Sequence, residues 1–482
     1  MSEAGCVSEQ LTFWDLGKQT VTVDFSGGAI VSDAGLLAVR RLDRQLGVLQ
    51  EAARRLPDPR APLLVTHSTE RILTQRVYQI LGGYFDGNDA QELRHDPLLK
   101  TLCDVSPQEN QPLASGSTLN RFQHAYTRRE AEKPLEERDV IFEQRAAHLE
   151  RIKQMNRYLV DLFVKTRRRR PERIVLDLDA TDDPTHGAQQ LSLFDGYHKQ
   201  YQYKPLLVLE GETGFPLGGH LRPGTAHDGW GAVDVLREIV AQLRACWPAV
   251  PILVRGDAGL ALPEVYEFCE AENLSYALGY SSNEVLKRRT QLLLNLAQAR
   301  FDLYEEKQQI FTAFRDYQAG TWPHPRTIVA KVEVMPQGVN RRFVVTNIRD
   351  APQAVYHGFY VKRGDVPERP IGELKNGLAI DRLSSPRFLA NAFTLQCHLL
   401  AYALIVLFRE ANEDEPEVAT AEVATLRGQL FKIGAVVQCS TRRIWFHFSS
   451  TWPRRSLFVR VCEAVDRFVK QLLPTALAGI PP

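Results

Sequence analysis

The order of extended and helical segments between residues 173 and 280 constrains the fold of this chain more than any other feature. Residues 173–181 alternate as a strand with two different faces: Ile174, Leu176 and Leu178 on one, and Val175, Asp177 and Asp179 on the other. The segments that follow predict strands at 203–211, 215–223, 251–257 and 274–280 and helices at 230–245 and 262–273. The predicted order is therefore β-β-β-α-β-α-β.

Placed in one sheet with right-handed parallel crossovers, this order matches the ribonuclease-H topology, in which the first and fourth strands lie side by side at the centre. We therefore predict an α/β fold, a ribonuclease-H-like mixed sheet with flanking helices. An α+β insertion interrupts it, because a helical run at 283–307 precedes two strand-like runs at 326–335 and 341–348.

Cysteine usage and hydropathy narrow the class of protein. Seven scattered cysteines without a CxxC pair argue against zinc ribbons and disulfide frameworks and favour a reducing cytoplasm. The first ten residues do not resemble a secretory signal, and we find no apolar run that approaches the ~20 residues needed to cross a bilayer. We therefore expect a cytoplasmic protein without a membrane partner.

The formal net charge is only +1, but basic residues gather in two places. One group directly precedes the first strand and the other lies near the C-terminus: Lys165, Arg167, Arg168, Arg169, Arg170 and Arg173, then Arg442, Arg443, Arg454 and Arg455. Each group is either a solvated face or a stripe that binds phosphates. Both groups are therefore candidate nucleic-acid contacts.

Two carboxylates occupy positions where burial makes them costly. Asp179 lies in an apolar strand, and Asp257 ends the fourth strand directly after Gly256. If the first and fourth strands are neighbours, the two carboxylates emerge side by side and suit Mg²⁺, which prefers a few protein oxygens together with water and phosphate. The alternatives are a helix N-cap for Asp257 and a turn hydrogen bond for Asp179.

A third carboxylate is expected from a helix after the last strand, where 360-YVKRGDVPERPIGELK-375 contains several candidates. The order Tyr360, Arg363, Glu368, Lys375 resembles the Tyr-Arg-Glu-Lys motif of the insertion-sequence-4 superfamily of DDE transposases. Further stretches resemble the insertion-sequence-1380 family of that group: 76–97, 113–122, 177–187, 255–261 and 374–402. The resemblance spans nearly the whole chain.

The resemblance implies roles for particular residues. Asp179, Asp257 and Glu368 would be the catalytic residues and the ligands of two Mg²⁺ ions, which Mn²⁺ can replace. Further residues would contact DNA: Tyr360, Arg363, Lys375, Arg167, Arg168, Arg169, Arg170, Arg442 and Arg443. The spacing between the motif's Arg and Glu is one residue longer than usual here, which leaves Glu373 as a rival for the third carboxylate.

The implied function is a transposase that binds the terminal inverted repeats of an insertion sequence and catalyses metal-dependent strand cleavage and transfer. Double-stranded DNA would be its partner, with a homodimer in the DNA complex. The alternatives are another ribonuclease-H-like DNA nuclease and an inactive DNA-binding relative.

Because 482 residues are too many for one ordinary hydrophobic core, we expect two or three domains. The predicted divisions are a mostly helical DNA-end-binding region (1–165), the first part of the catalytic core (166–282), the insertion (283–355), the second part of the core (356–410) and a C-terminal region (411–482). Helices are predicted at 34–56, at 68–84 with Ser68 as N-cap and Gly82–Gly83 as its end, at 132–166, and from Ile371 to about Arg409. A polar turn is predicted after residue 181, and extended segments are predicted within 426–450.

Overall fold

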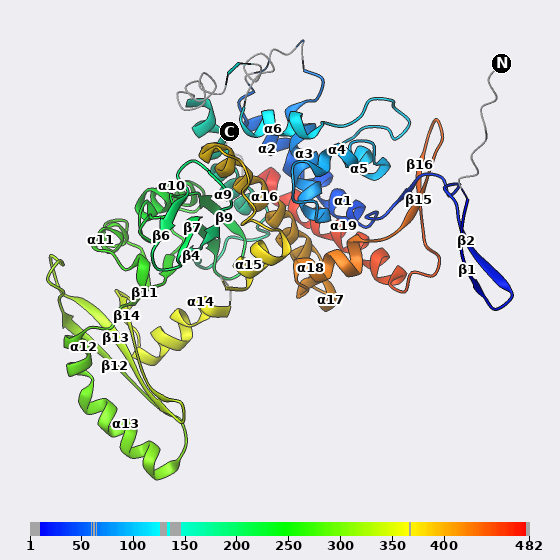
Figure 1. Cartoon of the computed structure of the whole chain (residues 1–482). Helices are drawn as coiled ribbons and strands as arrows, with labels where there is room; N and C mark the ends of the chain where they lie inside the picture. The colour runs from blue at the N-terminus through cyan, green and yellow to red at the C-terminus, as the bar shows by residue number, and fades with distance from the viewer. Residues whose placement is uncertain are drawn as a thin grey trace, which may run out of the picture.

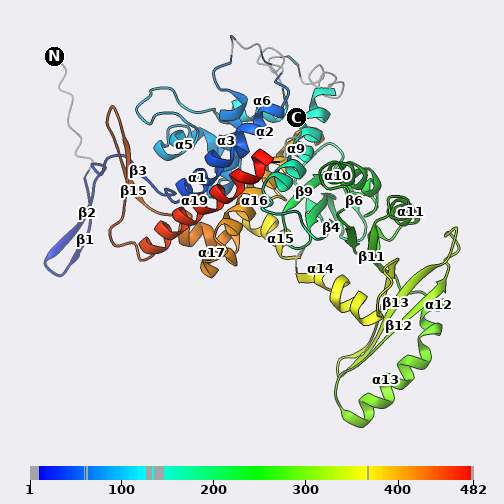
Figure 2. The same cartoon turned by 180° about the vertical axis from the view of Figure 1, so that it is seen from behind.

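The computed structural model of the chain describes residues 10–58, 60, 63, 65–125, 133–134, 146–365 and 368–478. A mixed sheet of eight strands is surrounded by helices, and the N-terminal helices gather with the C-terminal helix on one side of it (Figure 1). On the other side a group of strands with a long helix extends away from the rest of the molecule, as the reverse view also shows (Figure 2).

The first and fourth core strands lie side by side at the centre of the sheet, as the sequence predicts. β4 (Ile174–Ala180) pairs in parallel with β10 (Ile252–Gly256), which pairs in parallel with β11 (Ser275–Tyr280). On the other side, β8 (Leu206–Glu210) and β9 (Pro216–His220) add antiparallel strands. The chain crosses between parallel strands through α10 (Ala232–Cys246) and α11 (Pro263–Ala271).

The insertion continues the same sheet. Two helices, α12 (Glu284–Arg289) and α13 (Gln291–Tyr304), precede β12 (Gln308–Tyr317), β13 (Arg326–Met335) and β14 (Gly338–Thr346). β14 pairs antiparallel with β11, so the order across the sheet is β12-β13-β14-β11-β10-β4-β8-β9. β12 was not predicted from the sequence, because this edge strand is half-exposed along most of its length and lacks a clear alternation.

A long apolar helix, α16 (Phe388–Ala411), forms the centre of the hydrophobic core. It packs against α1 (Leu36–Leu46), α3 (Thr69–Gly82), α9 (Ala146–Lys165), α19 (Arg455–Ala478) and β9. By length and composition α16 could cross a membrane, yet its whole apolar window is buried inside the fold. The expectation that no apolar run approaches ~20 residues is therefore wrong, because α16 has such a run. Its apolar side chains form part of the hydrophobic core.

Glycine and serine set the ends of the N-terminal helices. The single helix predicted at 34–56 is broken at Gly47, whose φ of 67° ends α1 before α2 (Val48–Arg55) begins. The Ser68 hydroxyl caps α3, and Gly83 ends it with a φ of 95°, as predicted. Three short helices follow: α4 (Asp89–Leu93), α5 (Pro97–Leu102) and α6 (Gly116–Gln123). Of the helix predicted at 132–166, only the part within α9 and residues 133–134 lies in the described residues.

Segments from both ends of the chain share a small sheet. β15 (Ala435–Cys439) pairs with β16 (Ile444–Phe448) and with β3 (Ile30–Val31), which follows the hairpin β1 (Leu11–Leu16) and β2 (Gln19–Val23). The extended C-terminal segment is thus confirmed in part, because α18 (Val423–Leu426) and η5 (Arg427–Phe431) make its start helical. Another small sheet is formed by β5 (Asp183–Pro184), β6 (Leu193–Asp195) and β7 (Gln200–Tyr203), where the sequence predicts a polar turn.

Candidate active site

Asp179 and Asp257 lie at matching positions of the two central strands. In the parallel pairing of β4 with β10, Asp177 is opposite Arg255. Asp179 follows Asp177 by two residues, and Asp257 follows Arg255 by two residues. The Asp257 carboxylate accepts a hydrogen bond of 3.0 Å from the Gly259 amide, so it caps the 3₁₀ turn η2 (Ala258–Leu260). A cap and a metal ligand are compatible, since an ionised carboxylate has two acceptor oxygens.

A buried ion pair fixes the strands below these aspartates. Arg255 and Asp177 are both buried, and the guanidinium donates two hydrogen bonds of 2.6 Å to the carboxylate. Burial raises the pKa of Asp177, and the hydrogen bonds and charge of Arg255 oppose that rise. Arg255 also donates to the Phe359 carbonyl at 2.9 Å and thereby ties the π-helix η3 (Ala354–Tyr360) to the sheet.

The end of η3 and the short helix α14 (Lys362–Asp365) bring two predicted residues to this position. The Arg363 guanidinium donates to the Asp179 carboxylate at 3.0 Å. The Tyr360 hydroxyl lies against Gly279 of β11, where an added Cβ would be only 2.7 Å from it. Burial raises the pKa of Tyr360; positive Arg363 opposes this rise, and negative Asp257 adds to it. These four residues therefore form one cluster at the ends of the central strands.

Lys375 lies next to this cluster. Its ammonium group is 2.8 Å from the carboxylate of Asp182, three residues after Asp179. The neighbouring Asp183 is buried, and both of its carboxylate oxygens are among the buried atoms without a hydrogen-bond partner. Burial, followed by the negative charge of Asp381, raises the pKa of Asp183 to about 8. Asp183 therefore holds a proton at neutral pH.

The two rival glutamates differ in their surroundings. Glu368 begins α15 (Glu368–Gly372), and its side chain is outside the described part of the chain. Glu373 begins the π-helix η4 (Glu373–Gly377) and is buried. Its carboxylate accepts from Arg409 at 2.8 Å, from Arg369 at 3.2 Å and from the Tyr402 hydroxyl at 3.2 Å. The contacts with Tyr402 and Arg409 thus hold Glu373, and the segment that carries it, against α16.

Comparison with known families decides the class of this protein. The family described as "Transposase DDE domain group 1" matches residues 14–470. The chain belongs to this family of DDE transposases. Members of this class cleave DNA and generally use divalent metal ions. The finer assignment to the insertion-sequence-1380 family stays a prediction.

This transposase was also compared with curated protein sequences and with solved structures. A search of curated protein sequences found no match. Among solved structures, "Cryo-EM structure of piggyBac transposase synaptic complex with hairpin DNA" matches with a TM-score of 0.43 and 10% sequence identity. The match covers 94% of this chain and 86% of that chain.

The carboxylates of the transposase fit a divalent metal in part. Across the residues that the structure describes, no group of three or more His, Cys, Asp or Glu side chains is arranged as a metal site. Asp179 and Asp257 are the two hard oxygen ligands that the site would offer a divalent metal. Asp179 already contacts a positive charge, because the Arg363 guanidinium lies 3.0 Å from its carboxylate. The third predicted ligand is Glu368, whose side chain lies outside the described residues.

Of the arginines predicted to contact DNA, some form ion pairs within the protein and others are exposed. Arg167 pairs with Glu410 at 2.6 Å, and Arg168 pairs with Glu413 at 2.8 Å. Arg169 and Arg170 are exposed. Arg442 and Arg443 are exposed in the turn between β15 and β16, where the Arg443 guanidinium lies 5.6 Å from the Trp445 ring centre.

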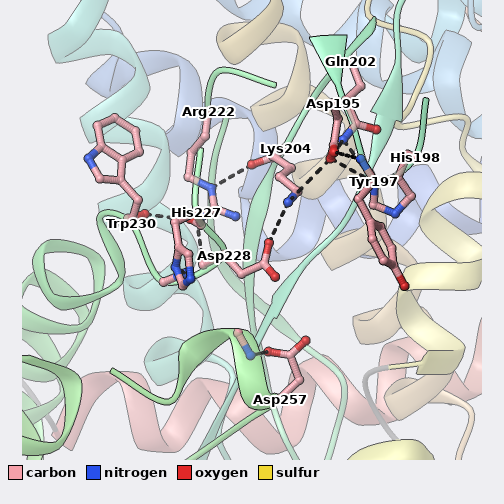
Figure 3. A network of polar contacts seen from close by, with 12 residues as sticks. Asp195, Tyr197, His198, Gln202, Lys204, Arg222, His227, Asp228, Trp230 and Asp257 are labelled. Atoms are coloured by element: carbon pink, nitrogen blue, oxygen red, sulfur yellow. Dashed lines mark hydrogen bonds and ion pairs between the residues drawn. The ribbon is translucent and has the colours of Figure 1, made fainter. Parts of the chain in front are cut away.

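Sequence reasoning missed a polar network that reaches the site (Figure 3). The buried Arg222 donates to the carbonyls of Lys204, His227, Asp228 and Trp230, which holds the loop before α10 in place. The Lys204 ammonium is 2.9 Å from Asp228 and 3.7 Å from Asp195 of β6.

Asp228 is the residue of this network that lies next to the candidate site. A Cβ added to Gly259 would be 2.4 Å from the Asp228 carboxylate, so Asp228 lies against the turn that Asp257 caps. No sequence signal identified Asp228, because it lies in an irregular loop, residues 221–231, that has no periodicity. Arg255 was also missed, although a charge inside the apolar run 251–257 requires a buried partner.

Proposed function

We propose that this transposase binds the terminal inverted repeats of an insertion sequence and carries out cut-and-paste transposition by metal-dependent strand cleavage and strand transfer. The observation that carries the proposal is the matching placement of Asp179 and Asp257, each two residues after the paired Asp177 and Arg255 of the adjacent parallel strands. The order of the five core strands supports a ribonuclease-H-like core within the larger sheet. The motif residues Tyr360, Arg363, Glu368 and Lys375 support membership of the insertion-sequence-4 superfamily, and the further stretches such as 177–187 and 374–402 support the insertion-sequence-1380 family within it.

In the proposed mechanism Asp179, Asp257 and Glu368 hold two Mg²⁺ ions. Bound there, the metal supplies activation of a nucleophilic oxygen and stabilisation of the leaving oxygen in an in-line displacement at phosphorus. Arg363, now paired with Asp179 at 3.0 Å, exchanges that carboxylate for a DNA phosphate when the substrate enters. Tyr360 and Lys375 hold neighbouring phosphates and thereby fix the position of the scissile bond.

The remaining contacts of the proposed DNA complex come from segments that precede and follow the core strands. Arg169 and Arg170 lie exposed before β4, and Arg442 and Arg443 lie exposed at a hairpin turn. We assign DNA-end recognition to the helical region 1–165, and we expect a homodimer to hold two ends in the cytoplasm, associated with the nucleoid. These contacts are to phosphates, so they supply affinity more than sequence preference.

The test is a cleavage assay with the full-length protein, Mg²⁺ and a duplex that carries the element's own terminal repeat. Asp179→Asn and Asp257→Asn should each lower the cleavage rate by ~10³-fold or more, because several kcal/mol of transition-state stabilisation are lost. Binding to the same duplex, measured by fluorescence anisotropy, should change little.

The matched control is Asp234→Asn on α10, because Asp234 is an exposed aspartate whose ion pair, with Arg237, lies within its own helix. It should cleave as the unaltered protein does. Substantial cleavage by Asp179→Asn or Asp257→Asn would overturn the catalytic assignment. Equal cleavage of duplexes with and without the terminal repeat would instead indicate a general DNA nuclease.

A further inference from the structure

Helix α13 carries apolar residues on two opposite faces. Leu294, Ala297 and Phe301 lie on the face that packs against β12 and β13, and Ala297 is fully buried there. At about 100° per residue, positions 292, 296, 299 and 303 gather on the opposite face, within ~30° of a common direction. A helix that only covers a sheet is expected to be polar on that outer face.

The outer face is exposed and continuous. Leu292 is 81% exposed, Leu303 is 71% exposed and Leu296 is 45% exposed. Ala299 is also exposed and lies between them. The spacing of four, three and four residues is that of a coiled-coil seam. We call these four residues the α13 seam. Figures 1 and 2 show that α13 lies at the far end of the insertion, away from the helical body.

The charges beside the seam have opposite signs at its two ends. Lys287, Arg288 and Arg289 precede it. At its other end three carboxylates, Asp302, Glu305 and Glu306, outnumber the cations, because Arg300 lies on the helix and Lys307 is paired with Glu333. Some of these charges are paired locally, because Lys287 contacts Glu284 and Arg289 contacts Asp316. Arg288 and Glu306 are exposed, one beyond each end of the seam. The helix is thus complementary to a reversed copy of itself.

We propose that the α13 seam binds the α13 seam of a second copy of this chain, antiparallel and about a two-fold axis between Leu296 and Ala299. Leu292 then faces Leu303 of the partner, and Leu296 fills the space above the partner's Ala299. The basic end of each helix lies beside the acidic end of the other, whereas a parallel pair would place like charges together. The contact gives the proposed homodimer a defined surface, but it does not depend on the catalytic assignment.

The short length of the α13 seam limits how much surface this contact can bury. A helix of 14 residues is about 21 Å long. Two such helices bury less than the ~1,200 Å² of a stable protein–protein interface. The pair should therefore dissociate on dilution, and it should persist where DNA holds two copies together.

Disulfide cross-linking of the full-length chain tests the orientation. In a background with Cys6→Ser and Cys246→Ser, chains with Leu292→Cys and chains with Leu303→Cys carry different tags and are mixed at high concentration. Mild oxidation should join the two kinds of chain, whereas Leu292→Cys alone should form few dimers. The control is Val339→Cys mixed with Leu303→Cys, because Val339 is 50% exposed in the same insertion but outside the seam. It should remain largely uncross-linked.

Charge reversal gives a second, independent readout by sedimentation. Arg288→Glu or Glu306→Lys alone should weaken self-association several-fold, and the double variant should restore it, because each basic end faces the partner's acidic end. Dimers from Leu292→Cys alone would overturn the antiparallel arrangement. Absence of the mixed cross-link, or self-association unchanged by Leu292→Glu with Leu303→Glu, would overturn the seam itself. Neither readout uses DNA cleavage.

Discussion

At the scale of single residues, the pair of Arg255 and Asp177 carries much of the geometry of the site. Both groups are buried, and Arg255 also holds the Phe359 carbonyl of the segment that leads to Tyr360 and Arg363. Removing one partner leaves the other charge buried without compensation, which is more costly than losing the attraction alone. The pair therefore acts on the site by holding it in shape.

Asp177→Asn should lower the free energy of unfolding by about 3–5 kcal/mol, because Arg255 then loses its charged partner in the core. Urea denaturation of the variant, beside Asp234→Asn, measures this loss. If Asp177→Asn unfolds like the unaltered protein and yet fails to cleave DNA, Asp177 is a metal ligand and not a structural anchor.

Asp183 should make stability depend on pH. Its pKa in the fold is about 8 against an ordinary 3.8, so the folded chain keeps a proton that the unfolded chain releases. The full stability is present below about pH 4 and is lost as pH rises toward 8, by roughly 1.4 kcal/mol per pH unit. Lys375, Asp182 and Asp381 are the charged groups that act on Asp183. Asp183→Asn removes this penalty.

The measurement is the Tm of both proteins at pH 4 and pH 8. The two should melt close together at pH 4, and Asp183→Asn should melt higher at pH 8. A constant difference between the two proteins at both values would show that Asp183 keeps an ordinary pKa.

Residue patterns predicted which positions carry charge but not which charges pair. The alternation in 173–181 correctly put Asp177 and Asp179 on one face, and the strand order made Asp257 their neighbour. No one-dimensional pattern distinguishes Asp177 from Asp179, because the difference lies in Arg255, 78 residues later. The position of Asp228 could not be predicted from the sequence either. It depends on hydrogen bonds from Arg222 to carbonyls of a loop without regular structure.

At the scale of elements, the segment that carries the two glutamates departs from an ordinary helix. The helix expected from Glu368 through Lys375 forms, but residues 373–377 are wound as a π-helix. The expected helix from Ile371 to about Arg409 is also interrupted, because residues 378–387 form no helix before α16. π turns and buried anchors depend on tertiary contacts, here those of Glu373 with α16, so local periodicity does not report them.

Glu368→Gln and Glu373→Gln should therefore fail in different ways. Glu373→Gln should lower the Tm, because it removes the charge that Arg409 and Arg369 contact. Glu368→Gln should leave the Tm unchanged and abolish cleavage in Mg²⁺. The assays are thermal unfolding and cleavage of terminal-repeat DNA. A stable Glu373→Gln protein without cleavage, beside an active Glu368→Gln protein, would move the third ligand to Glu373.

The basic run before β4 should contribute unequally to DNA binding. Arg169→Ala with Arg170→Ala should reduce the slope of log affinity against log salt by roughly 0.9 for each phosphate that the protein no longer neutralises. Arg167→Ala with Arg168→Ala should change the slope less and the Tm more, because these arginines hold Glu410 and Glu413. Equal salt slopes for all four arginine changes and the unaltered protein would mean that the run is only a solvated face.

At the scale of the whole molecule, one core joins segments from both halves of the sequence. A single hydrophobic cluster includes residues from Val31 to Leu472, with α16 at its centre. The insertion likewise shares hydrogen bonds with the central sheet through β11 and β14. The order of the core strands was predictable because it follows the chain, whereas the joining of β3 with β15 was not, since it pairs segments about 400 residues apart.

The place of α16 in the chain has a consequence for how the protein is made on the ribosome. Helices α1, α3 and α9 leave the exit tunnel before α16, but α19 follows it by more than forty residues. Until α19 is synthesised, one side of an apolar helix long enough to cross a bilayer remains uncovered. Nascent chains stalled after residue 411 should therefore recruit chaperones and be cut readily by protease. Chains released at full length should resist both.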